Sequence, residues 1–207
     1  VETKKTSEAE KVLQDGLRIN PNQTGFALAL STLQFDGVPR VFDVFETEID
    51  RQQTLCMTFE FIDGETLADQ LAGRRTAPDY NATALQMAEL AGIVQQIHSH
   101  HMCHWDLKPS NIMVDKSGKL WIVDFGLAVF TAERHLYHGV TVGTTPYMSP
   151  EQVGAEPSRD GRSDTWSLGA IFYQLLTGKP PFSGGSSELI RDAIRNGTLT
   201  PPRQIAP

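Results

Sequence analysis

The chain has 207 residues, 40% of them hydrophobic and 21% charged, a composition typical of a globular protein with one or two cores. Its formal net charge of -7 leaves no broad basic surface, which argues against a nucleic-acid-binding protein. No stretch approaches the ~20 apolar residues of a membrane-spanning helix, and the first residues, VETKKTSEAE, lack the apolar centre of a signal peptide. Cys56 and Cys103 are too few for a disulfide framework, so we predict a cytoplasmic protein.

Extended structure is predicted first along the chain, from residue 40 onwards. Residues 40–46 and 54–60 carry many β-branched and aromatic side chains and predict two antiparallel strands. The polar segment 47–53 is expected to connect them. Residues 64–73 predict a short helix that begins with a turn glycine, and residues 74–81 predict a loop.

Helices dominate the prediction from there on. A long helix is expected because apolar residues recur at the three-and-four spacing that lines one helical face: Leu90, Ile93, Val94 and Ile97. Residues 111–115 and 119–126 predict a hairpin around a Lys-Ser-Gly turn at 116–118. Residues 163–178 predict a helix that is apolar on most sides and therefore buried, and residues 186–197 predict a further helix.

Residues 98–111, HSHHMCHWDLKPSN, place four histidines and a cysteine within seven positions. A zinc site is one interpretation, because His100 and His104 have the four-residue spacing of a common ligand pair. A catalytic loop is the other interpretation, because an acid and a lysine stand at Asp106 and Lys108, followed by an asparagine. The motifs described next decide between the two.

The segment HWDLKPSN at 104–111 differs by one residue from the HRDLKxxN loop of protein kinases. The motif DFG follows at 124–126, then GTTPYMSPE at 143–151 and SDTWSLGAIFYQLLTGKPPF at 163–182. From about residue 35 to the end, the chain thus resembles a protein kinase of the serine/threonine type common in bacteria. The resemblance implies an α+β fold with a mostly helical C-lobe and an incomplete N-lobe β-sheet.

The resemblance also implies a role for each matching residue. Asp106 would accept the proton of the substrate hydroxyl, Lys108 would neutralise the transferring phosphate, and Thr144 would hydrogen-bond near both. Asn111 and Asp124 would hold two Mg²⁺ ions through hard oxygen ligands, with ATP phosphates and water completing the coordination. The lysine at 108 and the GTTPYMSPE segment are typical of kinases that phosphorylate serine or threonine in proteins.

Further positions follow from the same resemblance. The adenine of ATP would be held by backbone groups of the hinge, at Glu60 and Ile62. Asp164 would tie the backbone of the catalytic loop to the helix that it begins, and His104 would pack against Phe125. Two tryptophans are expected in the core, not at a ligand: Trp121 and Trp166.

Two positions after residue 100 depart from the family or lack a partner. Trp105 stands where the family has an arginine that pairs with a phosphate on the activation segment, so switching through this residue is not expected. Glu151 ordinarily pairs with an arginine, which would lie beyond the last residue given. Three threonines remain candidate phosphorylation sites: Thr131, Thr141 and Thr145.

Residues 1–34 match the family poorly. They contain no glycine-rich loop, and Phe26 stands where the family would have the glutamate that holds a strand lysine. Residues 9–34 resemble a tetratricopeptide-repeat fragment instead, because successive separations of four, three and five positions match its second helix and closing proline: Ala9, Leu13, Gly16 and Pro21. A degenerate kinase strand and helix is the alternative.

These observations predict three parts: an N-terminal helical segment at 1–34, a remnant of the kinase N-lobe and hinge at 35–62, and a C-lobe at 63–207 that lacks its last helices. The expected function is transfer of the ATP γ-phosphate to serine or threonine of a protein. The alternatives are an inactive, pseudokinase-like interaction module and a repeat-based scaffold. Missing elements at both ends would expose apolar surface, so marginal stability and self-association are expected.

Overall fold

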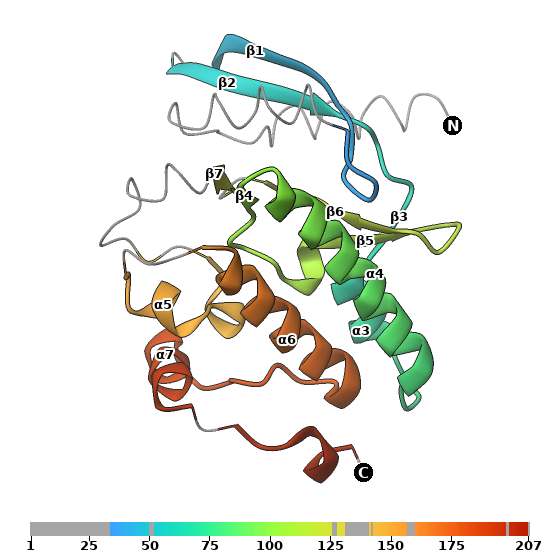
Figure 1. Ribbon diagram of the computed structural model, residues 1–207, viewed down its shortest axis with the longest axis vertical. Coiled ribbons are helices and arrows are strands. Elements are labelled where there is room, and N and C mark those ends of the chain that lie inside the picture. Colours follow the sequence, from blue (N-terminus) through green and yellow to red (C-terminus); the bar gives the residue numbers. More distant parts are fainter. Residues whose placement is uncertain are drawn as a thin grey trace. The chain divides into compact units, whose positions relative to one another are not determined.

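The structure is a computed structural model that describes residues 34–49, 52–125, 128–130, 141, 143–156, 160–197 and 199–206. The described residues form two compact units (Figure 1). The smaller unit contains residues 40–61, and the larger contains residues 35–39 together with the chain from residue 62 onwards. The tetratricopeptide-like prediction for residues 9–34 falls outside the described residues, except for Gln34.

The smaller unit is built on an antiparallel pair of strands, β1 (Val41–Ile49) and β2 (Gln52–Phe59). Both strands were predicted, but they reach further into the expected connector, because pairing continues until Ile49 lies opposite Gln52. The backbone N–H of Glu60 donates to the carbonyl of Arg40 at 2.8 Å, which extends the pairing past the end of β2.

The larger unit contains a three-stranded antiparallel sheet in the order β3-β5-β6: β3 (Gly64–Thr66), β5 (Ile112–Asp115) and β6 (Leu120–Ile122). Residues 64–66 were expected to begin a helix, but they pair with β5 instead. A Cβ on Gly64 would lie 2.1 Å from the carbonyl oxygen of Val114, so this close approach of two strands requires a glycine. Helix α3 (Leu67–Gly73) begins only after Thr66, which forms a capping box with Asp69.

The turn between β5 and β6 is organised by the carboxylate of Asp115. It accepts hydrogen bonds from the backbone N–H and hydroxyl of Ser117, at 2.8 and 2.6 Å, and from the indole N–H of Trp121 at 2.9 Å. The bonds from Ser117 and Trp121 hold the pKa of this carboxyl well below its usual range. Trp121 was expected in the core, but it is half-buried and the Lys119 ammonium lies 4.1 Å from its ring centroid.

Helices α4 (Tyr80–Ser99) and α6 (Gly161–Thr177) pack against each other and form the centre of the larger unit (Figure 1). The apolar stripe predicted for α4 is confirmed, with every member at most 5% exposed: Leu90, Ile93, Val94 and Ile97. Helix α4 begins inside the predicted loop, because the Asp79 side chain accepts hydrogen bonds from the N–H groups of Asn81 and Ala82. Helix α6 ends at Gly178, whose φ of 78° is a left-handed helix cap.

Short elements complete the larger unit. They are β4 (Met102–Cys103), which pairs with β7 (Val129–Phe130), the 3-10 helices η2 (Pro109–Asn111), η4 (Thr145–Tyr147) and η5 (Pro202–Gln204), and helices α5 (Pro150–Val153) and α7 (Ser187–Asn196). Trp166 stacks on Phe182 beside a cluster that also holds Met148 and Ile194, so its predicted core position is confirmed in part.

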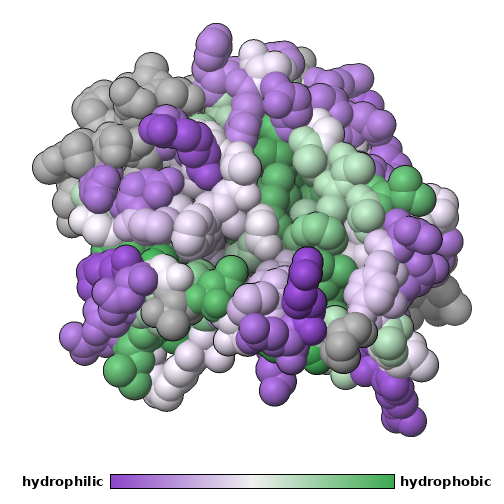
Figure 2. Space-filling model, turned by 60° about the horizontal axis from the view of Figure 1, so that its bottom comes forward, coloured by the Kyte–Doolittle hydropathy of each residue, from purple (hydrophilic) through white to green (hydrophobic). Residues whose placement is uncertain are grey.

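Apolar side chains also reach the surface of the larger unit. Figure 2 brings the bottom of Figure 1 forward and shows hydrophobic residues between polar ones on that face. The large exposed hydrophobic residues on or after α7 are Leu189, Leu199 and Ile205. No helix in the described ranges is both long enough and apolar enough to cross a membrane.

Candidate active site

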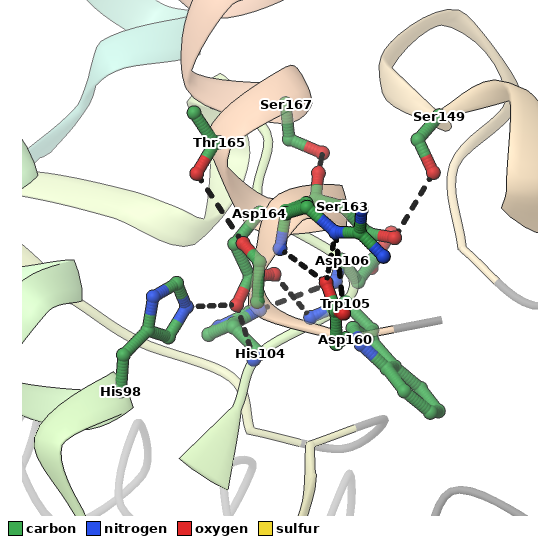
Figure 3. Close-up of polar contacts among 12 residues, drawn as sticks. His98, His104, Trp105, Asp106, Ser149, Asp160, Ser163, Asp164, Thr165 and Ser167 are labelled. Carbon is green, nitrogen blue, oxygen red and sulfur yellow. Dashed lines mark hydrogen bonds and ion pairs between the residues drawn. The ribbon is translucent and has the colours of Figure 1, made fainter. Parts of the chain in front are cut away.

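The loop that follows β4 is anchored by Asp164, a side chain with 0% exposure in the first turn of α6. One carboxylate oxygen accepts the backbone N–H of His104 at 2.9 Å, and the other accepts that of Trp105 at 2.7 Å (Figure 3). Trp105 has a φ of 62°, a conformation that costs a non-glycine residue free energy. The two charge-assisted bonds from Asp164 offset this cost and fix the loop, as the sequence predicted for this aspartate.

Trp105 is held on its other side by α5. Its carbonyl oxygen accepts a hydrogen bond from the Gln152 side-chain amide at 2.8 Å, and its side chain is only 1% exposed. Gly143, with a φ of 113°, passes so close that a Cβ would lie 3.0 Å from the same carbonyl. The residue at the position of the family's arginine is thus packed in the interior, which the sequence alone did not indicate.

His98, at the end of α4, joins this anchor. Its Nε2 lies 2.8 Å from an Asp164 carboxylate oxygen and donates to it, since an ionised carboxylate only accepts (Figure 3). Ligand atoms of His98, Cys103 and Asp164 lie within 4.8 Å of one another, the spacing of a metal cluster. The carboxylate oxygen nearest to His98 already accepts the His104 N–H as well, so the observed bonds favour an anchor over a metal site.

His104 is 1% exposed and its ring packs against Phe125 with centroids 4.9 Å apart, as predicted. Its Nδ1 accepts the backbone N–H of Asp106 at 3.3 Å, and its Nε2 therefore donates to the Val123 carbonyl at 3.3 Å. Burial lowers the pKa of His104, so the imidazole is neutral in this position. Both ring nitrogens are thus hydrogen-bonded to backbone groups, of Asp106 and Val123, and neither is left to form a metal site with His100.

Asp106, Lys108 and Thr144 form a closed triangle of hydrogen bonds. The Lys108 ammonium donates to Asp106 Oδ2 at 2.7 Å and to Thr144 Oγ1 at 2.9 Å, and Thr144 Oγ1 donates to Asp106 Oδ1 at 2.7 Å. The side chains of Asp106 and Lys108 are 11% and 22% exposed. A carboxylate, a cation and a hydroxyl therefore converge at a partly open position, although Thr144 lies 38 residues from Asp106.

Asn111 supports the triangle from η2. Its amide nitrogen donates to the Asp106 carbonyl at 3.0 Å and lies 3.4 Å from Asp106 Oδ2, which leaves the amide oxygen as the group to offer a cation. The Asn111 carbonyl accepts the N–H of Val123, next to Asp124. Asp124 was expected on the second strand of the hairpin, but β6 ends at Ile122 and Asp124 is exposed with a φ of 61°.

The remaining predicted positions are distributed over both units. Glu60 belongs to the smaller unit, and its N–H is bonded to Arg40, so its carbonyl oxygen is the group that it can offer. Ile62 belongs to the larger unit and is buried. Glu151, expected to pair with an arginine, accepts a hydrogen bond from Ser163 Oγ at 2.7 Å, which sequence reasoning missed. Of the three candidate threonines, one lies outside the described residues, one is exposed and one begins η4: Thr131, Thr141 and Thr145.

Comparison with known families is consistent with this geometry. Residues 27–204 match the family model described as "Protein kinase domain". The chain belongs to the protein kinase family. The expected α+β kinase fold is therefore confirmed, and members of the family use ATP and a divalent metal ion.

Bacterial serine/threonine kinases are among the similar proteins. The chain is 33% identical to "Serine/threonine-protein kinase PknB" of Mycolicibacterium smegmatis, over 85% of this chain and 28% of that protein. It is 34% identical to "Probable serine/threonine-protein kinase SCO3848" of Streptomyces coelicolor, over 86% and 27%. It is 36% identical to "Probable serine/threonine-protein kinase PknB" of Lactococcus lactis, over 79% and 25%. The chain thus spans about a quarter of the length of these relatives.

Proposed function

We propose that this chain is the catalytic part of a serine/threonine protein kinase, which transfers the γ-phosphoryl group of ATP to a hydroxyl of a protein substrate. The triangle of Asp106, Lys108 and Thr144 carries the proposal. In the reaction, the acceptor oxygen forms a bond to the γ-phosphorus, the bond from that phosphorus to the oxygen of ADP breaks, and the hydroxyl proton leaves to a base.

Asp106 is the base in this proposal. Its carboxylate is fixed at both oxygens, by Lys108 on one and Thr144 on the other, so it can orient the acceptor hydroxyl and take its proton. Phosphoryl transfer has a loose transition state with charge spread over oxygens, so orientation and charge neutralisation are the main tasks of the protein. The Lys108 ammonium supplies a positive charge. The Thr144 hydroxyl holds the Asp106 carboxylate and the Lys108 ammonium in position relative to each other.

Asn111 and Asp124 are the proposed ligands of Mg²⁺. An amide oxygen and a carboxylate are hard oxygen donors, and the Asn111 amide nitrogen is already engaged by Asp106, so this donor set fits the ion. Bound Mg²⁺ would neutralise charge on the phosphates of ATP. For the adenine, we propose the carbonyl of Glu60 and the backbone of Ile62.

Other expectations remain proposals. Cys56 and Cys103 are both buried and form no disulfide, which supports a reducing compartment such as the cytoplasm. The division into an N-lobe remnant at 35–62 and a C-lobe at 63–207 stays a prediction, although residues 35–39 belong to the larger compact unit. Self-association stays a prediction as well, and the exposed hydrophobic residues on and after α7 support it.

Calorimetry tests the proposal first. ATP with Mg²⁺ is titrated into the purified chain and into Asp124→Ala, and we expect binding to the original chain that the substitution abolishes. Transfer of radiolabelled phosphate to a serine peptide is then compared with Asp106→Asn, which should bind nucleotide but lose a factor of ~10² to 10⁴ in rate.

Two other outcomes would change the conclusion. Binding without transfer would favour the pseudokinase-like interaction module. A folded sample that neither binds ATP nor transfers phosphate would overturn the proposal for this chain.

A further inference from the structure

The peptide group between Trp105 and Asp106 is hydrogen-bonded at both ends. Its carbonyl, which belongs to Trp105, accepts the side-chain amide of Gln152 at 2.8 Å. Its N–H, which belongs to Asp106, donates to Nδ1 of His104 at 3.3 Å. A peptide group is planar, so its rotation changes ψ of Trp105 and φ of Asp106 together and turns the Asp106 side chain. The direction of the Asp106 carboxylate therefore depends on what holds this peptide group.

The amide of Gln152 has one orientation in this site. The side chain is 0% exposed, and its Oε1 accepts the backbone N–H of Ser149 at 3.0 Å. A backbone N–H can only donate, so the amide atom that faces it is the oxygen. The amide nitrogen is then the atom that faces the Trp105 carbonyl, as the bond to this carbonyl requires.

Helix α5, which carries this glutamine, is bonded to α6 and packed into the core. The hydroxyl of Ser149, at the start of α5, lies 3.1 Å from that of Ser163 on α6, and Ser163 donates to Glu151 at 2.7 Å. Val153, at the end of α5, is 3% exposed and belongs to the buried cluster that contains Phe182. The amide is therefore presented to the catalytic loop from a buried support.

Residues 143–152 contact the catalytic loop at two points. Thr144 donates to the Asp106 carboxylate at 2.7 Å, whereas Gln152 donates to the peptide group that precedes Asp106. A Cβ on Gly143 would lie 3.0 Å from the Trp105 carbonyl oxygen and 3.2 Å from the Gln152 amide nitrogen, so a glycine leaves room for their bond. The same segment thus contacts both the side chain and the backbone of the proposed base.

We propose that Gln152 is a positioning residue for phosphoryl transfer, because its amide holds the peptide group between Trp105 and Asp106 and so sets the direction of the Asp106 carboxylate. The inference rests on the proposed kinase function, because it takes Asp106 as the base. A base that is turned away from the acceptor hydroxyl transfers its proton less often, even when nucleotide is bound. Loss of the amide should therefore lower kcat and leave the KM for ATP nearly unchanged.

The substitution Gln152→Met tests the position of the base. Methionine is as long as glutamine but has no amide to donate to the Trp105 carbonyl. We expect kcat for a serine peptide to fall by about tenfold or more, with the KM for ATP within about twofold of the original value. Val153→Ala is the control, because it removes buried apolar volume from the same helix and leaves the bond to the loop intact. Its kcat should stay within about twofold of the original value.

Hydrogen–deuterium exchange of residues 104–108 is a second readout, and it requires no phosphoryl transfer. The exchange is measured under native conditions, well below the Tm of both variants. We expect the loop of Gln152→Met to exchange about tenfold or more faster than that of the original chain, because its peptide groups lose a restraint. The loop of Val153→Ala should exchange much more slowly than that of Gln152→Met.

Gln152→Glu tests the hydrogen bond itself. Glutamate keeps an oxygen for the Ser149 N–H, but its ionised carboxylate cannot donate to the Trp105 carbonyl, whereas its protonated form can. Burial, together with the Asp164 carboxylate that bonds the same tryptophan, should raise the pKa of this glutamate above the ordinary ~4.3. The kcat of the variant should therefore rise by about tenfold or more relative to that of the original chain as the pH falls from about 8.5 to about 6. A residue that only fills space would give no such recovery.

The outcomes separate the two proposals. An unchanged kcat in Gln152→Met, equal loop exchange in this variant and the original chain, equal losses in Val153→Ala, or no recovery of Gln152→Glu at low pH would overturn the inference. Each of these outcomes leaves the kinase function standing if the original chain transfers phosphate. Faster loop exchange in Gln152→Met, with no transfer by the original chain, would support Gln152 as the residue that holds the loop and refute the kinase function.

Discussion

Thr144 is bonded to both the proposed base and the cation of the triangle. Its hydroxyl accepts from Lys108 and donates to Asp106, at 2.9 and 2.7 Å. In Thr144→Val both bonds are lost while the size of the side chain is kept, so the base and the cation should lose their mutual orientation. We expect kcat for peptide phosphorylation to fall by about 10²-fold, with little change in the KM for ATP. Thr144→Ser keeps the hydroxyl and should recover most of the rate. A valine variant with the original kcat would show that the hydroxyl does not position Asp106.

His104 makes the stability of the larger unit depend on pH. Burial lowers the pKa of His104 in the folded chain below its ordinary value of 6.5, so the unfolded chain takes up a proton more readily. The contribution of His104 to the free energy of unfolding is fully present above pH 6.5. It is lost as the pH falls towards the lower pKa that His104 has in the folded chain. Urea unfolding at about pH 7 and about pH 5 measures the difference.

His104→Asn is the variant for that comparison, because the asparagine oxygen can accept the Asp106 N–H but does not titrate. The other histidines are the same in both proteins, so their contribution to the pH dependence of unfolding cancels in the comparison. The pH dependence of unfolding should therefore be smaller in the variant. An identical pH dependence would contradict the assignment to His104.

At the scale of elements, the Asp164 carboxylate joins helix α6 to the catalytic loop through two hydrogen bonds. Asp164→Asn removes the charge and turns an N–H₂ group towards one of the two backbone N–H donors, so a buried donor loses its acceptor. We expect the free energy of unfolding to fall by about 2 to 4 kcal/mol and the transfer rate to fall with it. Chemical denaturation and peptide kinetics measure both. Thr165→Ala, at an exposed position of the same helix, is the control and should change little.

Regular elements were predictable where local pattern and tertiary packing agree. The stripe of Leu90, Ile93 and Val94 marked the buried face of α4, because one side of a long helix faces the core. Strand β3 could not be predicted, because its three residues are stabilised only by pairing with β5, almost fifty residues away. The wrong expectation for Trp121 has a similar origin, since its place depends on the bond to Asp115 across the hairpin.

The candidate site was predictable as far as its motifs reach. Asp106, Lys108 and Asn111 stand in one short motif, so their proximity followed from the sequence. The bond from His98 to Asp164 joins residues 66 positions apart and carries no sequence signal of its own. The same holds for the cavity of about 330 Å³ beside Lys108 and Thr144, which arises only when α3 and the end of α6 are brought together.

At the scale of the whole molecule, nucleotide should stabilise the fold. A ligand that binds only the folded chain adds about 2.7 kcal/mol when its concentration is 100 times Kd. For a chain of this length, that corresponds to a rise in Tm of about 5 to 10 °C. We expect this rise with ATP and Mg²⁺ in differential scanning fluorimetry.

Two controls separate the metal-dependent site from general effects of nucleotide. ATP with a chelator should give a much smaller rise, because the phosphates would then lack the cation that Asn111 and Asp124 are proposed to hold. Asp124→Ala should respond equally weakly to ATP with and without Mg²⁺. Its unliganded Tm should fall by only a few degrees, because the side chain is exposed but alanine is less favourable than aspartate at a φ of 61°. Equal rises in the original chain with and without Mg²⁺ would contradict a metal-bridged nucleotide, since stabilisation would then not require the ligands contributed by the larger unit.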